Sequence, residues 1–388
     1  HAVLILSPKF RHQRPVRIMK LHLLDFQEEK AAELVRKVDS AQMLLRNDKT
    51  QTQAVILASP TGSGKTVIIA KALESIVQGD DERLPNADAT ILWLSDSPEL
   101  NEQSKQKFID CSDVFPSGQL EPIEASFDRR ILDPGKIYFI NTQKFASSST
   151  LARPPADGRH YTIWQTLTNT IEERGDDFLL VIDEAHKGML ASRTSADDSE
   201  AQTIVQRFLL GQPGQIPRVP LVLGLSATPK RFNAMLDASN RTAHKVIIDP
   251  AIVRESGLLK YRLLIHCPVA RQKHADDSLL REAVKNHLEM KKAWEHYCTV
   301  SKERSVRPML VVQVEDGSTK QDLFSKTDLD QLVRSIREEM PSVSPDEIAP
   351  CFQDEGQLQA DGIGIRRQEP WTLQDARLAE VVAFKPAL

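Results

Sequence analysis

The sequence has 388 residues, of which 40% are hydrophobic and 27% charged, and its formal net charge at pH 7 is -4. This length allows two domains, and the composition is typical of a globular protein and not of a disordered chain. Because the net charge is slightly negative, a nucleic-acid contact would need a local basic patch and not an overall positive field. No apolar run approaches the roughly 18 residues of a transmembrane helix, so no membrane association is expected.

The spacing of the cysteines indicates the cellular compartment. Cys111, Cys267, Cys298 and Cys351 are scattered without paired spacing. This argues against a disulfide framework or a structural zinc and favours a cytoplasmic protein with reduced thiols.

Residues 1–18 carry four basic and no acidic side chains. We expect them to be a disordered or non-native extension ahead of a natural start at Met19, with a nucleic-acid-binding arm as the alternative.

The first predicted helix begins near Leu24 and continues with apolar residues at helical spacing. Asp25 is a plausible N-cap, with Glu28 three residues later in the spacing of a capping box. Gln27 is suited to read an adenine, because a side-chain amide can accept from N6–H and donate to N7. The alternative is a solvated glutamine at a helix start.

A phosphate-binding loop is predicted between a short apolar run, 54–58, and a helical segment, 67–76. Glycines in such a loop let the backbone N–H groups approach phosphates, Lys65 supplies charge to the β- and γ-phosphates, and the Thr66 hydroxyl ligates Mg²⁺. Ser59 stands where the strict pattern has glycine, so the match is one residue short. The residues assigned to ATP binding are Thr61, Gly62, Ser63, Gly64, Lys65 and Thr66.

Further short apolar runs follow at 91–94, 137–140, 178–182, 221–223 and 245–248, with helix-like segments at 98–109, 160–174 and 199–210 between them. The runs are continuous and not alternating, which predicts strands buried on both faces. Alternation of strands and helices predicts an α/β fold with a parallel sheet. In such sheets ligands bind beyond the carboxyl ends of the strands.

Polar residues follow two of these runs directly. Asp183 and Glu184 come after 178–182; Asp183 is suited to hold Mg²⁺, and Glu184 to orient or deprotonate an attacking water. His186 is placed to bridge to the next motif. Ser226 and Thr228 follow 221–223 and could bond to the carboxylate motif and signal its state. The alternatives are a charged helix start and a Pro-terminated strand with a local hydroxyl turn.

Together these motifs carry a family resemblance. The segments 59–66, 183–186 and 226–228 resemble motifs I, II and III of superfamily-two DEAD/DEAH-box helicases, in that order. The connecting sequence is similar to the Res subunit of type III restriction enzymes. The stretches that carry this second resemblance are Leu92–Ser95, Ile140–Gln143, Thr203–Arg207, Gly211–Gly214 and Leu223–Phe232.

The resemblance implies an ATP-driven motor on nucleic acid, with duplex DNA as the expected substrate and ATP and Mg²⁺ as ligands. It implies two RecA-like domains that close on ATP, with Gln27, Lys65, Thr66, Asp183 and Glu184 supplied by the first. It also implies that Asn141, Thr142 and Gln143 face the phosphate backbone, which positions a protein without reading sequence. A modification methyltransferase subunit is the implied protein partner.

The expected domains are a first RecA-like P-loop NTPase domain over 19–255, a connecting strand and long helix over 256–305, and an incomplete second RecA-like domain over 306–388. An apolar stripe in the helix 276–298, including Trp294, predicts packing within the protein. No counterpart of motif V or VI is found before Leu388. The resemblance therefore implies a truncated chain with impaired hydrolysis, because the arginine finger of the second domain is worth about 10³–10⁵ in rate.

Two other functions fit the sequence. One is a superfamily-two motor of DNA repair or RNA remodelling. The other is an ATP-binding fragment without turnover.

Overall fold

The computed structural model describes residues 20–80, 83–155, 158–183, 204–227, 230–259 and 275–302, and shorter segments beyond them. The shorter segments are 305, 308–313, 329–344, 347–351, 359–360, 363–364 and 381–384. The chain divides into two compact units, residues 1–262 and 263–388. The predicted connecting segment 256–305 is split between them, since 256–259 lie in unit 1 and the long helix lies in unit 2. The extension at 1–18 lies outside the described residues.

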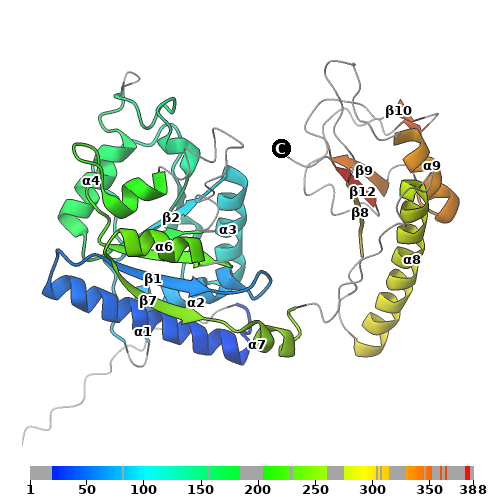
Figure 1. Ribbon diagram of the computed structural model, residues 1–388, viewed down its shortest axis with the longest axis horizontal. Coiled ribbons are helices and arrows are strands. Elements are labelled where there is room, and N and C mark those ends of the chain that lie inside the picture. The colour runs from blue at the N-terminus through cyan, green and yellow to red at the C-terminus, as the bar shows by residue number, and fades with distance from the viewer. Residues whose placement is uncertain are drawn as a thin grey trace, which may run out of the picture. The chain divides into compact units, whose positions relative to one another are not determined.

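A seven-stranded sheet forms the centre of unit 1, and every pair of neighbouring strands is parallel (Figure 1). The order across the sheet is β3-β4-β2-β5-β6-β1-β7. The sheet confirms the predicted α/β class and has the architecture of a RecA-like P-loop domain. Its strands are β1 (Gln53–Ala58), β2 (Thr90–Ser95), β3 (Leu120–Pro122), β4 (Ile137–Asn141), β5 (Phe178–Ile182), β6 (Leu221–Ser226) and β7 (Thr242–Ile247).

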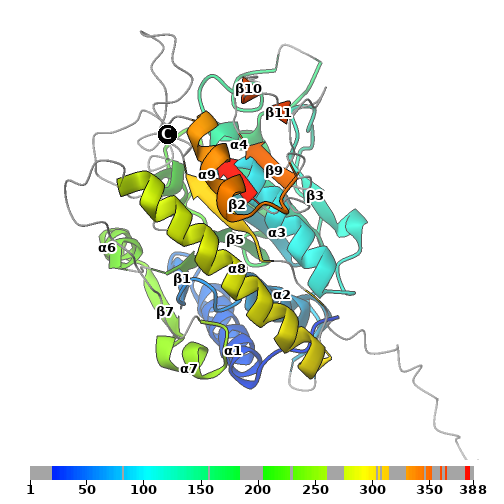
Figure 2. The same cartoon turned by 90° about the vertical axis from the view of Figure 1, so that its right-hand side faces the viewer.

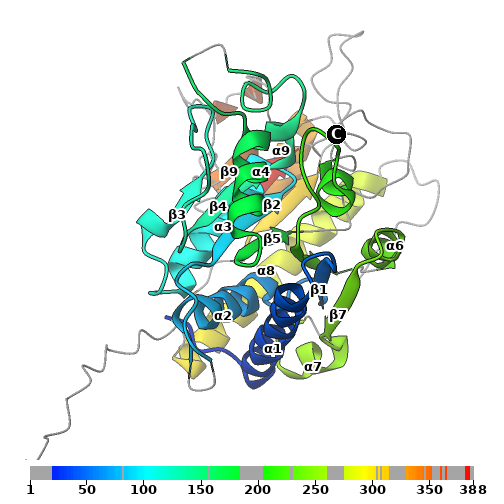
Figure 3. The same ribbon diagram turned by 90° about the vertical axis from the view of Figure 1, so that its left-hand side faces the viewer.

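Helices cover both faces of the five inner strands, β4, β2, β5, β6 and β1, which is why these strands are apolar on both sides. One core cluster joins α1, α2 and α3 to alternate strand residues such as Val55 and Trp93. The other joins α4, the helix at 204–210 and α6 to the intervening residues, such as Ile56 and Leu94. On the first face α1 and α2 lie side by side (Figure 3). The helices are α1 (Asp25–Asn47), α2 (Lys65–Gln78), α3 (Pro98–Cys111), α4 (Ile163–Arg174), α6 (Lys230–Ala238) and α7 (Pro250–Glu255), with 3₁₀ turns at Ser117–Gln119 and Thr142–Phe145.

The strands predicted from continuous apolar runs are confirmed, but the burial predicted on both faces is wrong for β7, which is an edge strand and mostly exposed. Elements β3, α6 and α7 were not predicted. The predicted cap of the first helix is wrong by one residue. Helix α1 begins at Asp25, its N-cap is Leu24, and the side chain that closes back onto the cap is that of Gln27 and not Glu28. The carbonyl of Leu24 already accepts from the backbone N–H groups of Gln27 and Glu28, so the cap position falls one residue earlier.

Gly224 in the middle of β6 allows α6 to pack directly on the sheet. A Cβ at this position would lie 2.1 Å from the Phe232 ring. Phe232 is fully buried in the core of that face. Glycine inside a strand commonly marks such a close approach. The position of α6, and with it the chain that follows Ser226, therefore depends on the missing side chain at 224.

Replacing Gly224 with alanine should destabilise unit 1 by about 3 kcal/mol, because the buried ring cannot move away without opening the core. Chemical denaturation of the two proteins measures this loss. Gly118→Ala is the matched control, since a Cβ there meets nothing within 4 Å. The steric explanation predicts that adding Phe232→Ala recovers part of the loss; equal stabilities of Gly224→Ala and Gly118→Ala would contradict it.

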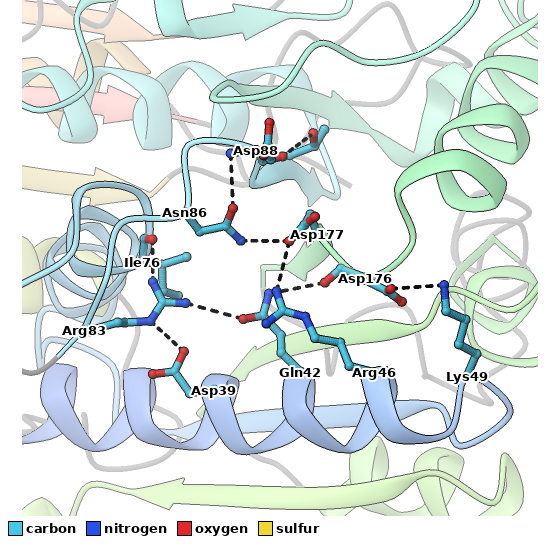
Figure 4. Close-up of polar contacts among 11 residues, drawn as sticks. Asp39, Gln42, Arg46, Lys49, Ile76, Arg83, Asn86, Asp88, Asp176 and Asp177 are labelled. Atoms are coloured by element: carbon cyan, nitrogen blue, oxygen red, sulfur yellow. Dashed lines mark hydrogen bonds and ion pairs between the residues drawn. The ribbon is translucent and has the colours of Figure 1, made fainter.

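At the amino ends of the strands, a polar network ties α1 to the rest of unit 1 (Figure 4). Arg83 Nε lies 2.6 Å from Asp39 Oδ1, and Arg46 lies 3.4 Å from Asp177. Asp177 also accepts from the Asn86 side chain at 2.9 Å. The network fixes α1 against the loop after α2 and the residues before β5.

Helices α2 and α3 share one buried ionisable group. Glu74 of α2 is 4% exposed and accepts a short hydrogen bond from the Ser112 hydroxyl at the end of α3. Burial raises the pKa of the Glu74 carboxyl above its ordinary value, and the Ser112 hydrogen bond offsets part of this rise. A carboxyl with a raised pKa in the folded state costs stability as the pH rises above its unfolded pKa.

Glu74→Gln should therefore gain stability relative to the unsubstituted protein as the pH rises above about 4.5, because the amide carries no charge to bury. Urea denaturation between pH 4 and pH 8 measures the difference. Glu99→Gln should show the opposite trend, since a hydrogen bond from Ser97 lowers the pKa of Glu99. Parallel pH profiles for the two variants would show that burial of Glu74 has no such effect.

Unit 2 has a three-stranded parallel sheet in the order β8-β12-β9, packed against two helices. Helix α9 lies along the first half of α8 (Figure 2), where Arg281 pairs with Asp277 on its own helix and with Glu338 and Glu339 of α9. The elements are α8 (Ala275–Ser301), β8 (Leu310–Gln313), α9 (Leu329–Glu339), β9 (Ile348–Cys351), β10 (Gln359–Ala360), β11 (Ile363–Gly364) and β12 (Val381–Phe384).

The predicted apolar stripe of α8 is buried only in part. Val284 is fully buried, whereas Trp294 is 40% exposed and stacks on Tyr297 with ring centroids 5.4 Å apart. The second half of the helix extends beyond α9, and Trp294 and Tyr297 are exposed there, whereas Cys298 is buried. Among the described helices, none has the length and apolar character needed to cross a membrane.

Candidate nucleotide-binding site

The loop between β1 and α2 adopts the conformation expected of a phosphate cradle. Gly62 and Gly64 have φ values of +88° and +83°, in the left-handed region that favours glycine. Thr61 and Gly62 are exposed, and Ser63 is fully buried. Two left-handed residues separated by one position turn the backbone sharply and make room for a ligand next to its N–H groups.

Helix α2 begins at this loop with an N-terminus suited to an anion. Its N-cap is Gly64, which has no side chain to accept from the first turn, and the first turn contains no acidic residue. The orphan N–H groups and the dipole at such a terminus favour a phosphate. Lys65 and Thr66, both half-buried, are the first two residues of the helix. The donor set therefore fits the predicted triphosphate.

Hydrogen bonds within the loop hold its shape. The hydroxyls of Ser59 and Ser63 form a short hydrogen bond across the loop. The ammonium of Lys65 lies 3.5 Å from the carbonyl oxygen of Ser59, so the lysine is directed along the loop. Serine at position 59, where the strict pattern has glycine, thus supplies a brace between the two ends of the cradle.

Gln27 links the start of α1 to this loop. Its Nε2 donates to the carbonyl oxygen of Ser63 at 3.0 Å, and its Oε1 accepts from the Leu24 N–H at 3.0 Å. Gln27 is 7% exposed, so the alternative of a solvated glutamine is wrong. Each end of the amide keeps one further hydrogen-bonding position, so the adenine-reading role stays a prediction.

The sheet order places the other predicted residues beside the loop. Strand β6 lies between β1 and β5, with Ala58 opposite Ser226 and Ile182 opposite Gly224. Asp183 directly follows β5, is half-buried, and its N–H donates to Leu94 O at 2.9 Å. Ser226 is fully buried at the end of β6, and its carbonyl accepts from the Ser59 N–H at 3.1 Å. A hydroxyl and a carboxylate, Thr66 and Asp183, fit Mg²⁺, which usually binds one or two protein groups plus phosphate oxygens.

The predicted nucleic-acid-facing residues lie at the carboxyl ends of β2 and β4. Asn141 pairs with Ser95 across these strands and is 3% exposed. Thr142 is 9% exposed and its hydroxyl donates to the Asp96 carbonyl at 3.3 Å. Gln143 is exposed. In this conformation only Gln143 of the three presents its side chain to a ligand, because Asn141 and Thr142 are buried.

Three predicted site residues, Glu184, His186 and Thr228, lie outside the described residues. Their predicted roles stay predictions.

A cavity of about 750 Å³ lies between the start of α1 and α7. Leu24 and Phe26 line it on one side, and Ile248, Ile252 and Ser256 on the other. Gln27 follows Phe26 in the sequence and bonds to Ser63 of the phosphate loop, although none of the residues that line the cavity belongs to the loop. The residues of α7 are not evident from the sequence, because a six-residue helix with one buried side chain leaves no periodic signal.

A second cavity, of about 430 Å³, lies at the opposite, amino-terminal edge of the sheet. Its charged residues include Lys49, Asp176 and Asp177. Lys49 pairs with Asp176 at 3.1 Å, and Asp177 pairs with Arg46 (Figure 4). These charges stabilise the domain through one another, whereas the left-handed glycines and the uncapped helix start lie at the carboxyl edge.

Comparison with protein families agrees with this geometry. Residues 20–231, a little over half of the chain, match the family described as type III restriction enzyme, res subunit. The chain belongs to this family. No curated protein matches the chain.

Membership of the res subunit family makes the chain a superfamily-two helicase-like member of a family of ATP-dependent motors. The matched residues contain the phosphate loop, Asp183 and Ser226, and they end in α6. The family therefore accounts for the arrangement of unit 1 around β1, β5 and β6.

Gln27→Ala should weaken nucleotide binding about tenfold, because the bond to Ser63 that fixes the loop is lost. Gln42→Ala is the matched control: Gln42 is also a buried glutamine of α1 but bonds to Arg83 and the Asp176 backbone at the other end of the helix. Fluorescent-nucleotide titration and urea denaturation separate the two effects. Both variants should lose about 1 kcal/mol of stability, but only Gln27→Ala should lose affinity. If Gln27→Ala and Gln42→Ala bound the nucleotide equally well, Gln27 would not be part of the binding site.

Proposed function

We propose that the chain is an ATP-dependent motor that moves on duplex DNA and works in a type III-like restriction or defence system. The observation that carries the proposal is the strand order β5-β6-β1, with Asp183, Ser226 and the phosphate loop at neighbouring carboxyl ends. Family membership supports the coarser statement of a helicase-like motor. Duplex DNA, the defence role and a modification methyltransferase partner go beyond it.

In this proposal each residue of the site has one task. Lys65 and the N–H groups at the start of α2 bind the β- and γ-phosphates of ATP. Thr66 and Asp183 hold Mg²⁺, which neutralises charge on the phosphates when bound. Glu184 orients or deprotonates the attacking water. Phosphoryl transfer needs positioning and charge neutralisation more than covalent catalysis. In this proposal these residues are therefore sufficient to bind and position ATP and Mg²⁺.

The cavity beside the loop suits the base of the nucleotide. Its walls contain the apolar side chains of Leu24, Phe26, Ile248 and Ile252, between which a planar ring can lie. Gln27 sits between this cavity and the phosphate loop and has hydrogen-bonding capacity left for an adenine edge.

The proposed nucleic-acid contact is made at the carboxyl ends of β2 and β4. Gln143 is the exposed side chain there, and α3 begins beside it with Ser97 as its N-cap. The bond from Thr142 to Asp96 joins the two segments, so a contact with one is transmitted to the other. Such contacts position a protein on the phosphate backbone without reading bases.

Lys65→Ala should lower nucleic-acid-stimulated ATP hydrolysis at least about 100-fold, because a charge directed at the transferred phosphoryl group is lost. Lys71→Ala, on the same helix beyond the loop, is the matched control and should retain activity. Phosphate release measured with duplex DNA, single-stranded DNA and RNA tests the substrate.

Several outcomes decide between the functions. Stimulation by RNA and not by duplex DNA would favour an RNA-remodelling motor. ATP binding without turnover under any condition would favour a nucleotide-binding protein. An unchanged rate in Lys65→Ala would overturn the site itself.

A further inference from the structure

Residues 248–259 meet both the phosphate loop and the strand that leads into it. The N–H of Ile248 donates to the carbonyl of Ala58 at 2.9 Å, and Ala58 is the last residue of β1 before the loop. After α7 the chain returns, and the Leu259 side chain reaches the middle of the loop. Its Cδ2 lies 3.4 Å from the position that a Cβ would take on Gly62. The segment thus begins beside the end of β1 and returns to the loop at Gly62.

The same segment forms a wall of the neighbouring cavity. Ile248, Ile252 and Ser256 face the start of α1 across it, and α7 lies next to that end of α1 (Figure 1). A ligand part in this cavity would therefore touch residues 248–256, and a phosphate held by the loop would lie next to Gly62, which Leu259 approaches.

The segment is also weakly held. Helix α7 has six residues, of which only Val253 is buried, while Ile252 and Leu258 are 41% and 42% exposed. The chain turns at Gly257, which has a φ of +82°. Leu259 packs against the core beside the loop. Elements with few buried contacts open locally at low free energy, and such elements respond most to a bound ligand.

The segment also lies at the end of unit 1 in the sequence. Residues 256–259 are the last described part of unit 1, and unit 2 begins at Leu263. Ordering of residues 256–259 would therefore act at the end of the described part of unit 1.

We propose that residues 248–259 are the nucleotide-sensing segment of unit 1, and that Leu259 is the positioning residue that couples the phosphate loop to the chain leaving for unit 2. The inference rests on the proposed function, since it takes the loop to bind a nucleotide. Nucleotide in the site orders α7 and residues 256–259 by direct contact. By thermodynamic linkage, the ordered segment raises the affinity for nucleotide by the same factor.

Hydrogen exchange of the full chain, followed by mass spectrometry with and without ADP and Mg²⁺, tests the inference. The reporting amides are those of Ser256 and Gly257, which donate to Ile252 and Arg254. At an ADP concentration about 100 times the Kd, their exchange should slow by up to about 100-fold.

Leu259→Ala should reduce this ADP-induced protection at least about fivefold and weaken ADP binding by the same factor, as linkage requires. Leu258→Ala is the matched control, because that side chain is exposed and only its backbone carbonyl approaches Gly62; it should behave like the unsubstituted chain. Leu259→Met, which conserves volume, should restore most of the protection.

The failures are distinguishable. If Leu259→Ala lowers protection equally with and without ADP, its role is only structural and the inference is wrong. If the unsubstituted chain binds ADP but the segment gains no protection, the inference fails while the nucleotide site stands. If ADP does not bind and Lys65→Ala changes nothing, the proposed function fails and the inference fails with it.

Discussion

Two glycines of the phosphate loop allow two distant segments of unit 1 to reach the loop backbone. At Gly64 a Cβ would lie 2.6 Å from the Gln27 amide, so the bond that joins α1 to the loop exists only because that Cβ is missing. At Gly62 the Leu259 side chain approaches the position that a Cβ would take. The same left-handed turns that expose N–H groups to a phosphate thus also connect the loop to the first helix and to the last segment of the domain.

The parallel sheet determines which residues share the site. Because β6 inserts between β1 and β5, residues far apart in the sequence, Ser59, Ser226 and Asp183, end at one edge. Helices on both faces bury the strands, so the register cannot slip without exposing a core face. Packing also constrains β6 itself, because Phe232 of α6 lies against Gly224, two residues before Ser226 on this strand. Binding residues and packing residues are therefore close neighbours along β6.

Much of the fold and the centre of the site was predictable from local patterns. Continuous apolar runs predicted the strands correctly, since burial on both faces removes alternation. The loop from Ser59 to Thr66 was predictable because a phosphate cradle needs glycine, lysine and a hydroxyl at fixed spacing. Short elements such as β3 and α7 were missed, because three to six residues leave no period to detect. The N-cap of the first helix was predicted one residue too late, at Asp25, because the cap at Leu24 uses a glutamine side chain three residues later.

Residue chemistry and spacing were enough to predict the family, which the family comparison confirmed, and to propose the class of ligand and the residues that would hold it, since these depend on local sequence. Proximity between distant segments depends on the folded chain. Tertiary structure decided that Gln27 is buried against the loop, that Asn141 and Thr142 are buried, and that Leu259 lies at Gly62. Each of these depends on a contact between residues that no periodic pattern connects, and packing alone brings them together.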